Sequence, residues 1–390
     1  LQRELVAIPA LGPKNGGQGE RIKADWLKAH LAGLGFSDIR EFNAPDDAVD
    51  CGQRPNLVAV LPGQDTSRTC WILSHIDVVP PGDPELWDSD PWTLKRDGDT
   101  IIGRGVEDNH HGLVASVLAA RAFLDQGLAP AMNLGLVLVA DEETGSHHGL
   151  EYLVREHADV FDAHDLFLVP DFGVADSSLM EVAEKSMLWL KVTVNGKQCH
   201  ASTPEQGVNS LVAAAALILE ARRRLHEVFD AEDALFDPPR STFEPTRKDA
   251  NVENVNTLPG RDVFYLDSRV LPQYRVDDVI DEVRACADAV EAAHPGISIE
   301  LEEVLKEQAA PATPADAEVV TRLAAAIAEV HGVTARPGGV GGGTVAAFLR
   351  RCGFPAVVWA TLGHEAHQPN ERASLSNILA DAKVMAALVC

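Results

Sequence analysis

Short apolar runs that alternate with helical stretches are the feature that most constrains the fold. The runs are strand-sized and occur at Asn56–Leu61, Thr69–Ser74, Thr100–Ile102, Asn133–Ala140 and Leu166–Val169. Helices are expected at Gly19–Leu34, Gly112–Gln126 and Gly149–Glu156. This order predicts an α/β domain with a mostly parallel, buried sheet. In such sheets, ligands gather outside the C-terminal ends of the strands.

The middle of the chain has a different pattern. Alternating and helical segments follow one another at Met187–Val194, Ser210–Leu225, Val263–Val270, Val276–Ala293 and Ile297–Val304. They predict a small α+β unit with antiparallel strands. Phe229–Asn251 is expected to be a long irregular excursion within it. We therefore expect a first catalytic segment at 1–183, an inserted lid at 184–308, and a second catalytic segment at 309–390.

Composition excludes several classes of partner. The 390 residues carry a net charge of −26, which argues against binding nucleic acid or an anionic membrane. No apolar run reaches the ~18–20 residues of a membrane span, and the opening residues lack the pattern of a signal peptide. The six cysteines form no CxxC pair, so we expect a reduced, cytoplasmic setting. Cys199 is expected to be a small buried residue.

The segment Ser74-His75-Ile76-Asp77 directly follows an apolar run. In a strand, His75 and Asp77 point to the same side. A carboxylate in that place can hold the second nitrogen of a metal-bound imidazole. By itself the pair fits a structural histidine equally well.

Asp108 stands in the loop before the helix that starts near Gly112. It is a candidate metal ligand, and a helix N-cap is the competing interpretation. His110 and His111 are ligands by residue type, but they are less favoured because they enter the helix.

Asp141, Glu142 and Glu143 follow the buried run Asn133–Ala140. Clustered carboxylates repel one another unless cations neutralise them, although a solvated acidic turn is the simpler alternative. Adjacent glutamates can divide two duties, one as a metal ligand and the other as a general base.

Asp171 and His367 also follow predicted strands. With His75, Asp108 and Glu143 they give five imidazole and carboxylate ligands without a thiolate. This set suits zinc, cobalt or manganese. Five ligands exceed the need of one tetrahedral zinc and suit two ions roughly 3.5–4 Å apart, bridged by one carboxylate.

These motifs resemble the aminoacylase, carboxypeptidase G and succinyl-diaminopimelate desuccinylase family of dizinc metallopeptidases, over nearly the whole chain. The matching stretches are SHIDVVP, GRGVEDNHHG, DEETG, PDFG and HEAHQPNE. The resemblance implies that His75, Asp108, Glu143, Asp171 and His367 hold two metal ions, with Asp108 as the bridge and a cis peptide bond after it. It also implies that Asp77 supports His75 and that Glu142 is the general base.

The resemblance extends to the lid, which is ferredoxin-like in the family. GKQCHAS supplies His200, which in dimeric members stabilises the oxyanion in the partner's active site. NTLP, DSR and the Gly-Gly-Thr loop supply the expected substrate contacts Asn256, Arg269, Gly343 and Thr344. A homodimer through the lid is therefore expected.

The implied reaction is hydrolysis of an amide bond in a small, carboxylate-bearing substrate. An N-acyl amino acid, acetyl or succinyl, is slightly favoured over a dipeptide or short peptide. Desuccinylases continue Gly-Gly-Thr with Ser-Asp, whereas Val345-Ala346 follow here, which leaves the substrate open. A non-hydrolytic metal-binding relative is disfavoured, because no ligand or base is missing.

Overall fold

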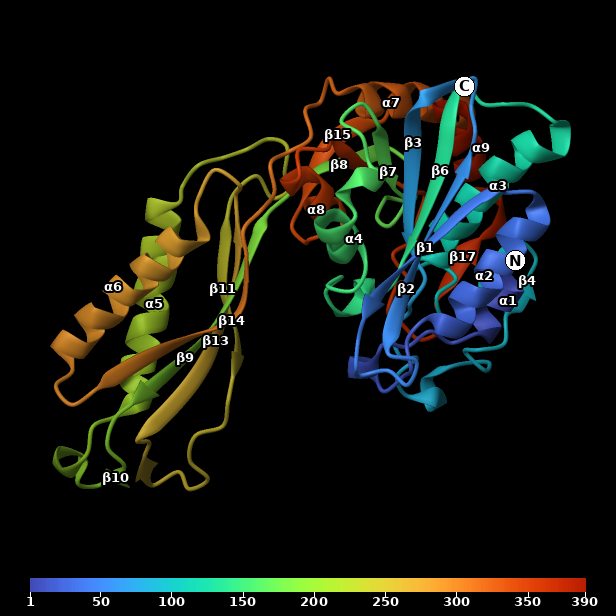
Figure 1. Ribbon diagram of the computed structural model, residues 1–390. Helices are drawn as coiled ribbons and strands as arrows, with labels where there is room; N and C mark the ends of the chain where they lie inside the picture. The colour runs from blue at the N-terminus through green and yellow to red at the C-terminus, as the bar shows by residue number, and fades with distance from the viewer. The chain divides into compact units, whose positions relative to one another are not determined.

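The computed structural model describes all 390 residues, which form two compact units (Figure 1). Unit 1 consists of Leu1–Val182, Ala312–Gly338 and Thr344–Cys390. Unit 2 consists of Ala183–Pro311 and Gly339–Gly343. The short glycine-rich segment 339–343 thus packs with unit 2, although it lies in the stretch expected to be the second catalytic segment.

A mixed eight-stranded sheet forms the centre of unit 1. Its strands are β1 (Asp38–Pro45), β2 (Gln53–Leu61), β3 (Asp65–His75), β6 (Met132–Val139), β7 (Leu166–Val169), β8 (Leu179–Glu184), β15 (Arg336–Val340) and β16 (Ala356–Val358). They are ordered β1-β2-β6-β3-β7-β16-β8-β15, and the central strands β6, β3, β7 and β16 run parallel. The predicted α/β class is confirmed. Four of the five predicted apolar runs lie in strands of this sheet, both faces of which are covered, whereas Thr100–Ile102 forms a strand of a smaller, separate sheet.

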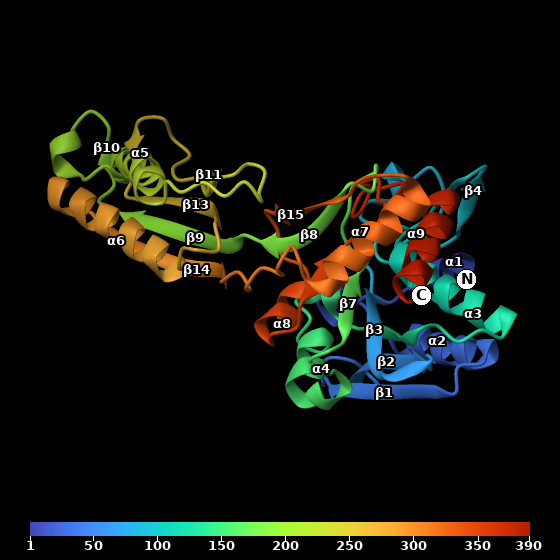
Figure 2. The ribbon, with the colours of Figure 1, turned by 90° about the horizontal axis from the view of Figure 1, so that it is seen from above.

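Helices lie on both faces of this sheet (Figures 1 and 2). They are α1 (Gln2–Ala7), α2 (Arg21–Leu34), α3 (His110–Gln126), α4 (Leu150–Glu156), α7 (Glu318–His331), α8 (Ala346–Arg351) and α9 (Leu375–Leu388). One face packs against α4 and α8, and α3, α7 and α9 pack together beside the other. A small sheet of β4 (Lys95–Asp97), β5 (Thr100–Ile102) and β17 (Arg372–Ser374) completes the unit. None of the helices combines the length and apolar character that spanning a bilayer requires.

Unit 2 is an antiparallel sheet with two helices on one face (Figure 2). The strands are β9 (Ser186–Asn195), β11 (Thr242–Lys248), β13 (Arg261–Val270) and β14 (Ser298–Glu307), in the order β11-β13-β9-β14. The helices are α5 (Ser210–Val228) and α6 (Val276–Ala293), and a separate pair joins β10 (Cys199–His200) to β12 (Thr257–Leu258). Alternate β9 residues from Leu188 to Val194 are buried against the helices. The predicted α+β insertion is confirmed.

The expectation that all of Phe229–Asn251 is irregular was wrong. Thr242–Lys248 forms β11, which pairs with β13 and has a register shift between Pro245 and Arg247. A proline and a run of charged residues argue against a central strand. An edge strand tolerates both, because one row of its backbone groups has no strand partner.

Gly135 in β6 gives a test of the central packing. It lies opposite Trp71, and a Cβ atom there would stand 2.1 Å from the indole ring. We expect Gly135→Ala to lower the free energy of unfolding by about 1–3 kcal/mol, because the buried ring has to shift. Gly33→Ala in α2, where nothing lies within 4 Å of the new Cβ, should instead raise it by about 0.5–1 kcal/mol. Urea unfolding of both variants is the measurement, and equal effects would contradict this packing.

Candidate metal centre

The ends of three central strands place charged side chains at one edge of the sheet. His75 is the last residue of β3, and Asp171 stands two residues after β7. Glu142 and Glu143 follow β6 in a short 3-10 turn, Glu142–Thr144. Because parallel strands end at the same edge, these four side chains meet.

The two remaining candidates come from loops. Asp108 lies between β5 and α3, and His367 lies in the long loop between β16 and β17. Asp108 is not the N-cap of α3, since Asn109 takes that position. The peptide bond between Asp108 and Asn109 is cis, as the resemblance implies.

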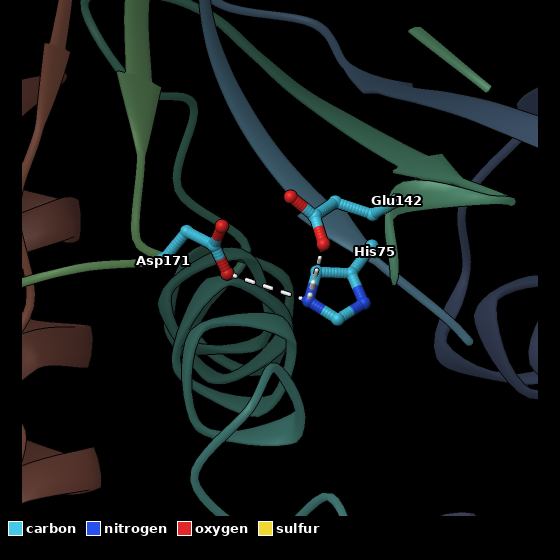
Figure 3. A group of neighbouring side chains, drawn as sticks. All are labelled: His75, Glu142 and Asp171. Carbon is cyan, nitrogen blue, oxygen red and sulfur yellow. Dashed lines mark ion pairs between the residues drawn. The ribbon is translucent and has the colours of Figure 1, made fainter. Parts of the chain in front are cut away.

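His75 is the centre of one group of side chains. Its Nε2 atom lies 2.8 Å from Asp108 Oδ1, 3.4 Å from Asp171 Oδ1 and 3.9 Å from Glu142 Oε2. Figure 3 shows Asp171 and Glu142 pointing toward the imidazole from two sides. The imidazole is 2% exposed, whereas the three carboxylates around it are 12–20% exposed, so solvent reaches the group from the carboxylate side.

His367 is the centre of a second group. Its Nε2 atom lies 3.2 Å from Asp108 Oδ2 and 3.1 Å from Glu143 Oε2. In contrast to His75, the side chain is 56% exposed. The two oxygens of Asp108 therefore contact different histidines, and this one carboxylate joins the two groups.

Burial and mutual charge shift the pKa values in these groups. Burial opposes the charged imidazole of His75, but its hydrogen bonds to Asp108 and Asp171 hold its pKa well above the usual value. Hydrogen bonds to Asp108 and Glu143 raise the pKa of His367 to about 10. Burial raises the pKa of Glu143 to about 7, and burial together with the charge of Asp171 raises that of Glu142 well above its usual value.

The donor set fits divalent cations. His75 lies with Glu142 and Asp171, and again with Asp108 and Glu143, in groups whose ligand atoms are all within 4.8 Å of one another. The Oε1 atom of Glu143 is buried without a hydrogen-bond partner. A buried carboxylate oxygen of this kind is costly unless a cation or donor satisfies it.

Asp77 does more than hold the imidazole. His75 Nδ1 lies 3.0 Å from the backbone carbonyl oxygen of Asp77 and 3.4 Å from its carboxylate oxygen Oδ1. The two carboxylate oxygens accept the backbone N–H groups of Glu142 and Glu143 at 3.2 and 3.1 Å. Asp77 therefore couples the ends of β3 and β6.

Sequence reasoning missed a buried ion pair behind the same turn. Arg54 donates from Nε to Glu20 at 2.6 Å, and a second guanidinium nitrogen also contacts that carboxylate. Arg54 Nη1 lies 3.4 Å from Asp141, and the Asp141 N–H points at Glu20. Asp141 thus faces this pair, while Glu142 and Glu143 face the histidines. No local sequence signal connects residues so far apart in the chain.

The neighbouring helix residues have structural partners. His110 Nε2 lies 3.0 Å from the buried Lys23 amine, and His111 Nε2 lies 2.8 Å from Asp381. Both are therefore occupied outside the metal centre, as their helical position indicates. Asn109, which sequence reasoning did not single out, donates to Asp171 Oδ1 at 2.5 Å and orients that carboxylate.

The predicted lid residues divide into two places within unit 2. His200 is exposed on β10 and pairs with Thr257, and the carbonyl of Asn256 accepts the N–H of Ala201 at 2.8 Å. His200 and Asn256 are thus neighbours beyond the Arg261 end of β13. Cys199, expected to be buried, is only half-buried beside them.

Arg269 lies near the other end of β13. It donates to both oxygens of Asp267, at 2.9 and 3.0 Å, and to the carbonyl of Gly341 at 2.9 Å. Gly343 packs near Met187 in the same unit. Thr344 belongs to unit 1, where its hydroxyl accepts the N–H of Ala346 at the start of α8.

Comparison with known proteins identifies the family. The model of peptidase family M20/M25/M40 matches residues 71–390. The chain belongs to this family. It is a metallohydrolase that acts on amide or peptide bonds. An uncharacterized metallohydrolase of Methanocaldococcus jannaschii is 38% identical, over 98% of this chain and 96% of that protein.

More distant relatives carry specific names. Succinyl-diaminopimelate desuccinylase 2 of Shewanella loihica is 25% identical over 99% of this chain and 98% of that protein. Two solved structures share the fold over the whole chain: a Staphylococcus aureus tripeptidase (TM-score 0.74, 20% identity, 95% of that chain) and a dinuclear metal-binding peptidase of Bacillus subtilis (TM-score 0.66, 15% identity, 95% of that chain).

The two carboxylate oxygens of Asp77 accept two different backbone N–H groups. An asparagine accepts only one of the two backbone N–H groups, so Asp77→Asn should displace the Glu142–Glu143 turn. We expect metal affinity to fall about 10–100-fold, the usual effect of losing a residue that orients metal ligands. Titration against a chelator is the measurement, with the exposed Asp47→Asn as control and circular dichroism to verify folding. Unchanged affinity in a folded Asp77→Asn protein would contradict this role.

Proposed function

We propose that this protein uses a pair of divalent metal ions to hydrolyse the amide bond of a small substrate with a free carboxylate, preferably an N-acyl amino acid. The observation that carries the proposal is the position of Asp108, whose two oxygens contact His75 and His367. A single-ion site would not need two separate imidazole groups joined by one carboxylate.

The same side chains would supply two adjacent ligand sets. His75 and Asp171 would hold one ion, His367 and Glu143 the other, and Asp108 would bridge them. Imidazole and carboxylate donors without thiolate suit Zn²⁺, with Co²⁺ or Mn²⁺ as alternatives. When bound, such a pair polarises the scissile carbonyl and makes a water molecule more acidic.

Glu142 is the proposed general base. Its carboxylate lies 3.9 Å from His75 Nε2, which places it beside the ligands. Its pKa is raised by burial first and by Asp171 second, which increases its affinity for a proton. In this role Glu142 takes the proton of the attacking water and then delivers it to the leaving amine.

Arg269 is the proposed partner of the substrate carboxylate. Asp267 and the Gly341 carbonyl fix its guanidinium, and N–H groups remain for an end-on contact with an anion. This contact serves an N-acyl amino acid and a short peptide alike. The named desuccinylase relative favours the first, and the tripeptidase fold relative keeps the second as the alternative.

The lid geometry supports a homodimer. His200 and Arg269 lie at opposite ends of β13, and its rise of ~3.3 Å per residue separates them by roughly 25 Å. A small substrate cannot touch both in one chain. We infer that His200 and Asn256 serve the active site of a second copy, where His200 stabilises the developing oxyanion.

Exposed apolar side chains on α5 provide a surface for this contact. Val212 and Leu219 are 54% and 72% exposed and lie two helical turns apart, so they share one side of the helix.

A hydrolysis panel with added Zn²⁺ or Co²⁺ tests the function. It compares N-acetyl and N-succinyl amino acids with dipeptides and tripeptides, and we expect the highest kcat/KM on an N-acyl amino acid. The Glu142→Ala variant should lose about 10²–10⁴-fold or more in kcat while it retains both metal ions, because it removes the base and no ligand. The exposed Glu156→Ala on α4 is the control. Metal binding without turnover of any substrate would favour a binding protein.

Subunit complementation tests the dimer. His200→Ala and Glu142→Ala should each be nearly inactive alone. In a mixed dimer, one of the two sites receives an intact Glu142 from its own chain and an intact His200 from the other. An equimolar mixture should therefore recover about a quarter of wild-type activity, since half the dimers are mixed. Activity that stays at the level of the single variants would rule out the shared site.

A further inference from the structure

The loop that carries Asp108 is held by a carboxylate from the loop between β16 and β17, which also carries His367 and is called the C-terminal loop below. The side chain of Glu371 is fully buried. Its Oε2 atom accepts from Arg104 Nη1 at 2.7 Å and from the Gly105 N–H at 2.9 Å. Its Oε1 atom accepts the N–H groups of Glu107 and Asp108 at 2.9 and 3.0 Å. One side chain therefore fixes the backbone up to the bridging aspartate.

The C-terminal loop is in turn held by a carboxylate from the loop of Asp108. The carboxylate of Glu107, the residue before Asp108, is 3% exposed and points into the loop that carries His367. Its Oε1 atom accepts the Gly363 N–H at 2.5 Å, and its Oε2 atom accepts the Glu365 N–H at 2.5 Å. Each loop thus provides one buried carboxylate that satisfies backbone donors of the other.

The C-terminal loop needs such external support. His364, His367 and Asn370 all have left-handed backbone conformations, with φ of 64°, 63° and 59°. Non-glycine residues adopt this conformation at a cost, and it persists where the surroundings hold it. The side chain of His367 is itself largely exposed, so packing of the imidazole does not hold the loop.

We propose that Glu107 and Glu371 form a reciprocal clamp that sets the spacing between Asp108 and His367, and so shapes the more exposed of the two metal-ion positions. Both are positioning residues, since their oxygens are taken up by N–H donors and neither is a ligand. The effect on ion binding rests on the proposed two-ion function. The hydrogen bonds between the two loops are independent of that function.

Glutamine is a sharp probe of the clamp. In both glutamates each carboxylate oxygen accepts at least one backbone N–H, so an amide NH₂ opposes a donor in either orientation. Glu371→Gln and Glu107→Gln therefore break the contact with little change in shape. Glu365→Gln is the matched control, because that carboxylate lies in the same loop and contacts Arg372, at 3.7 Å.

Hydrogen exchange on the metal-free protein is the first measurement. Glu371→Gln should speed exchange about 10-fold or more at Gly105, Glu107 and Asp108, and Glu107→Gln should do so at Gly363 and Glu365. The faster exchange should be confined to the opposite loop in each variant, whereas a general loss of stability would speed exchange throughout the protein. Exchange in the opposite loop within twofold of wild type, for both variants, overturns the clamp.

Titration with Co²⁺ is the second measurement. Both variants should bind one ion about 10–100-fold more weakly and keep the other, in the same pattern as His367→Ala. Equal weakening of both ions, in step with a lower Tm, would show a purely structural role and overturn the proposal. A wild type that binds no second ion refutes the two-ion function and the clamp's effect on it together. A wild type that binds two ions but hydrolyses no amide refutes only the proposed reaction.

Discussion

The carboxylate of Asp108 is the contact on which the centre depends. Its two oxygens lie within 3.2 Å of imidazole nitrogens from His75 and His367, residues almost three hundred positions apart. Burial disfavours its charge, yet the two histidines hold its pKa below the usual value. Close approach of Asp108, Glu142, Glu143 and Asp171 would be strongly repulsive without these imidazoles and a compensating cation. The strand ends and loops of unit 1 hold these charged side chains close together.

The charged side chains of the centre are held in place mainly by hydrogen bonds from backbone N–H groups and side-chain amides. Asp77 accepts the N–H groups of the Glu142–Glu143 turn, and the amide of Asn109 donates to Asp171. The carboxylate of Glu371 accepts the backbone N–H of Asp108. Each interaction ties one segment that carries a proposed metal ligand to another. The centre is therefore a connected network, in which moving one ligand shifts its neighbours.

The parts of the site that local pattern determines were predictable. An apolar run followed by His75, or by Glu142 and Glu143, places those residues at a strand end, and parallel pairing then brings the strand ends together. Three features were not accessible in this way. The Glu20–Arg54 pair and the Glu371 contacts join residues far apart in the chain, with no periodicity to reveal them. β11 was hidden because an edge strand tolerates Pro245, which local propensity treats as a strand breaker.

Unit 2 imposes a different constraint, which is set by length. β13 is a single continuous strand that pairs with β9 along its whole length. It separates Arg269, which contacts Asp267 near one end, from the exposed His200 beyond the other end. This separation lies within unit 2 and is set by that unit alone. If one small substrate uses both residues, the second must come from another molecule. The proposed dimer thus rests on the length of one strand, and in that proposal catalysis and assembly depend on the same element.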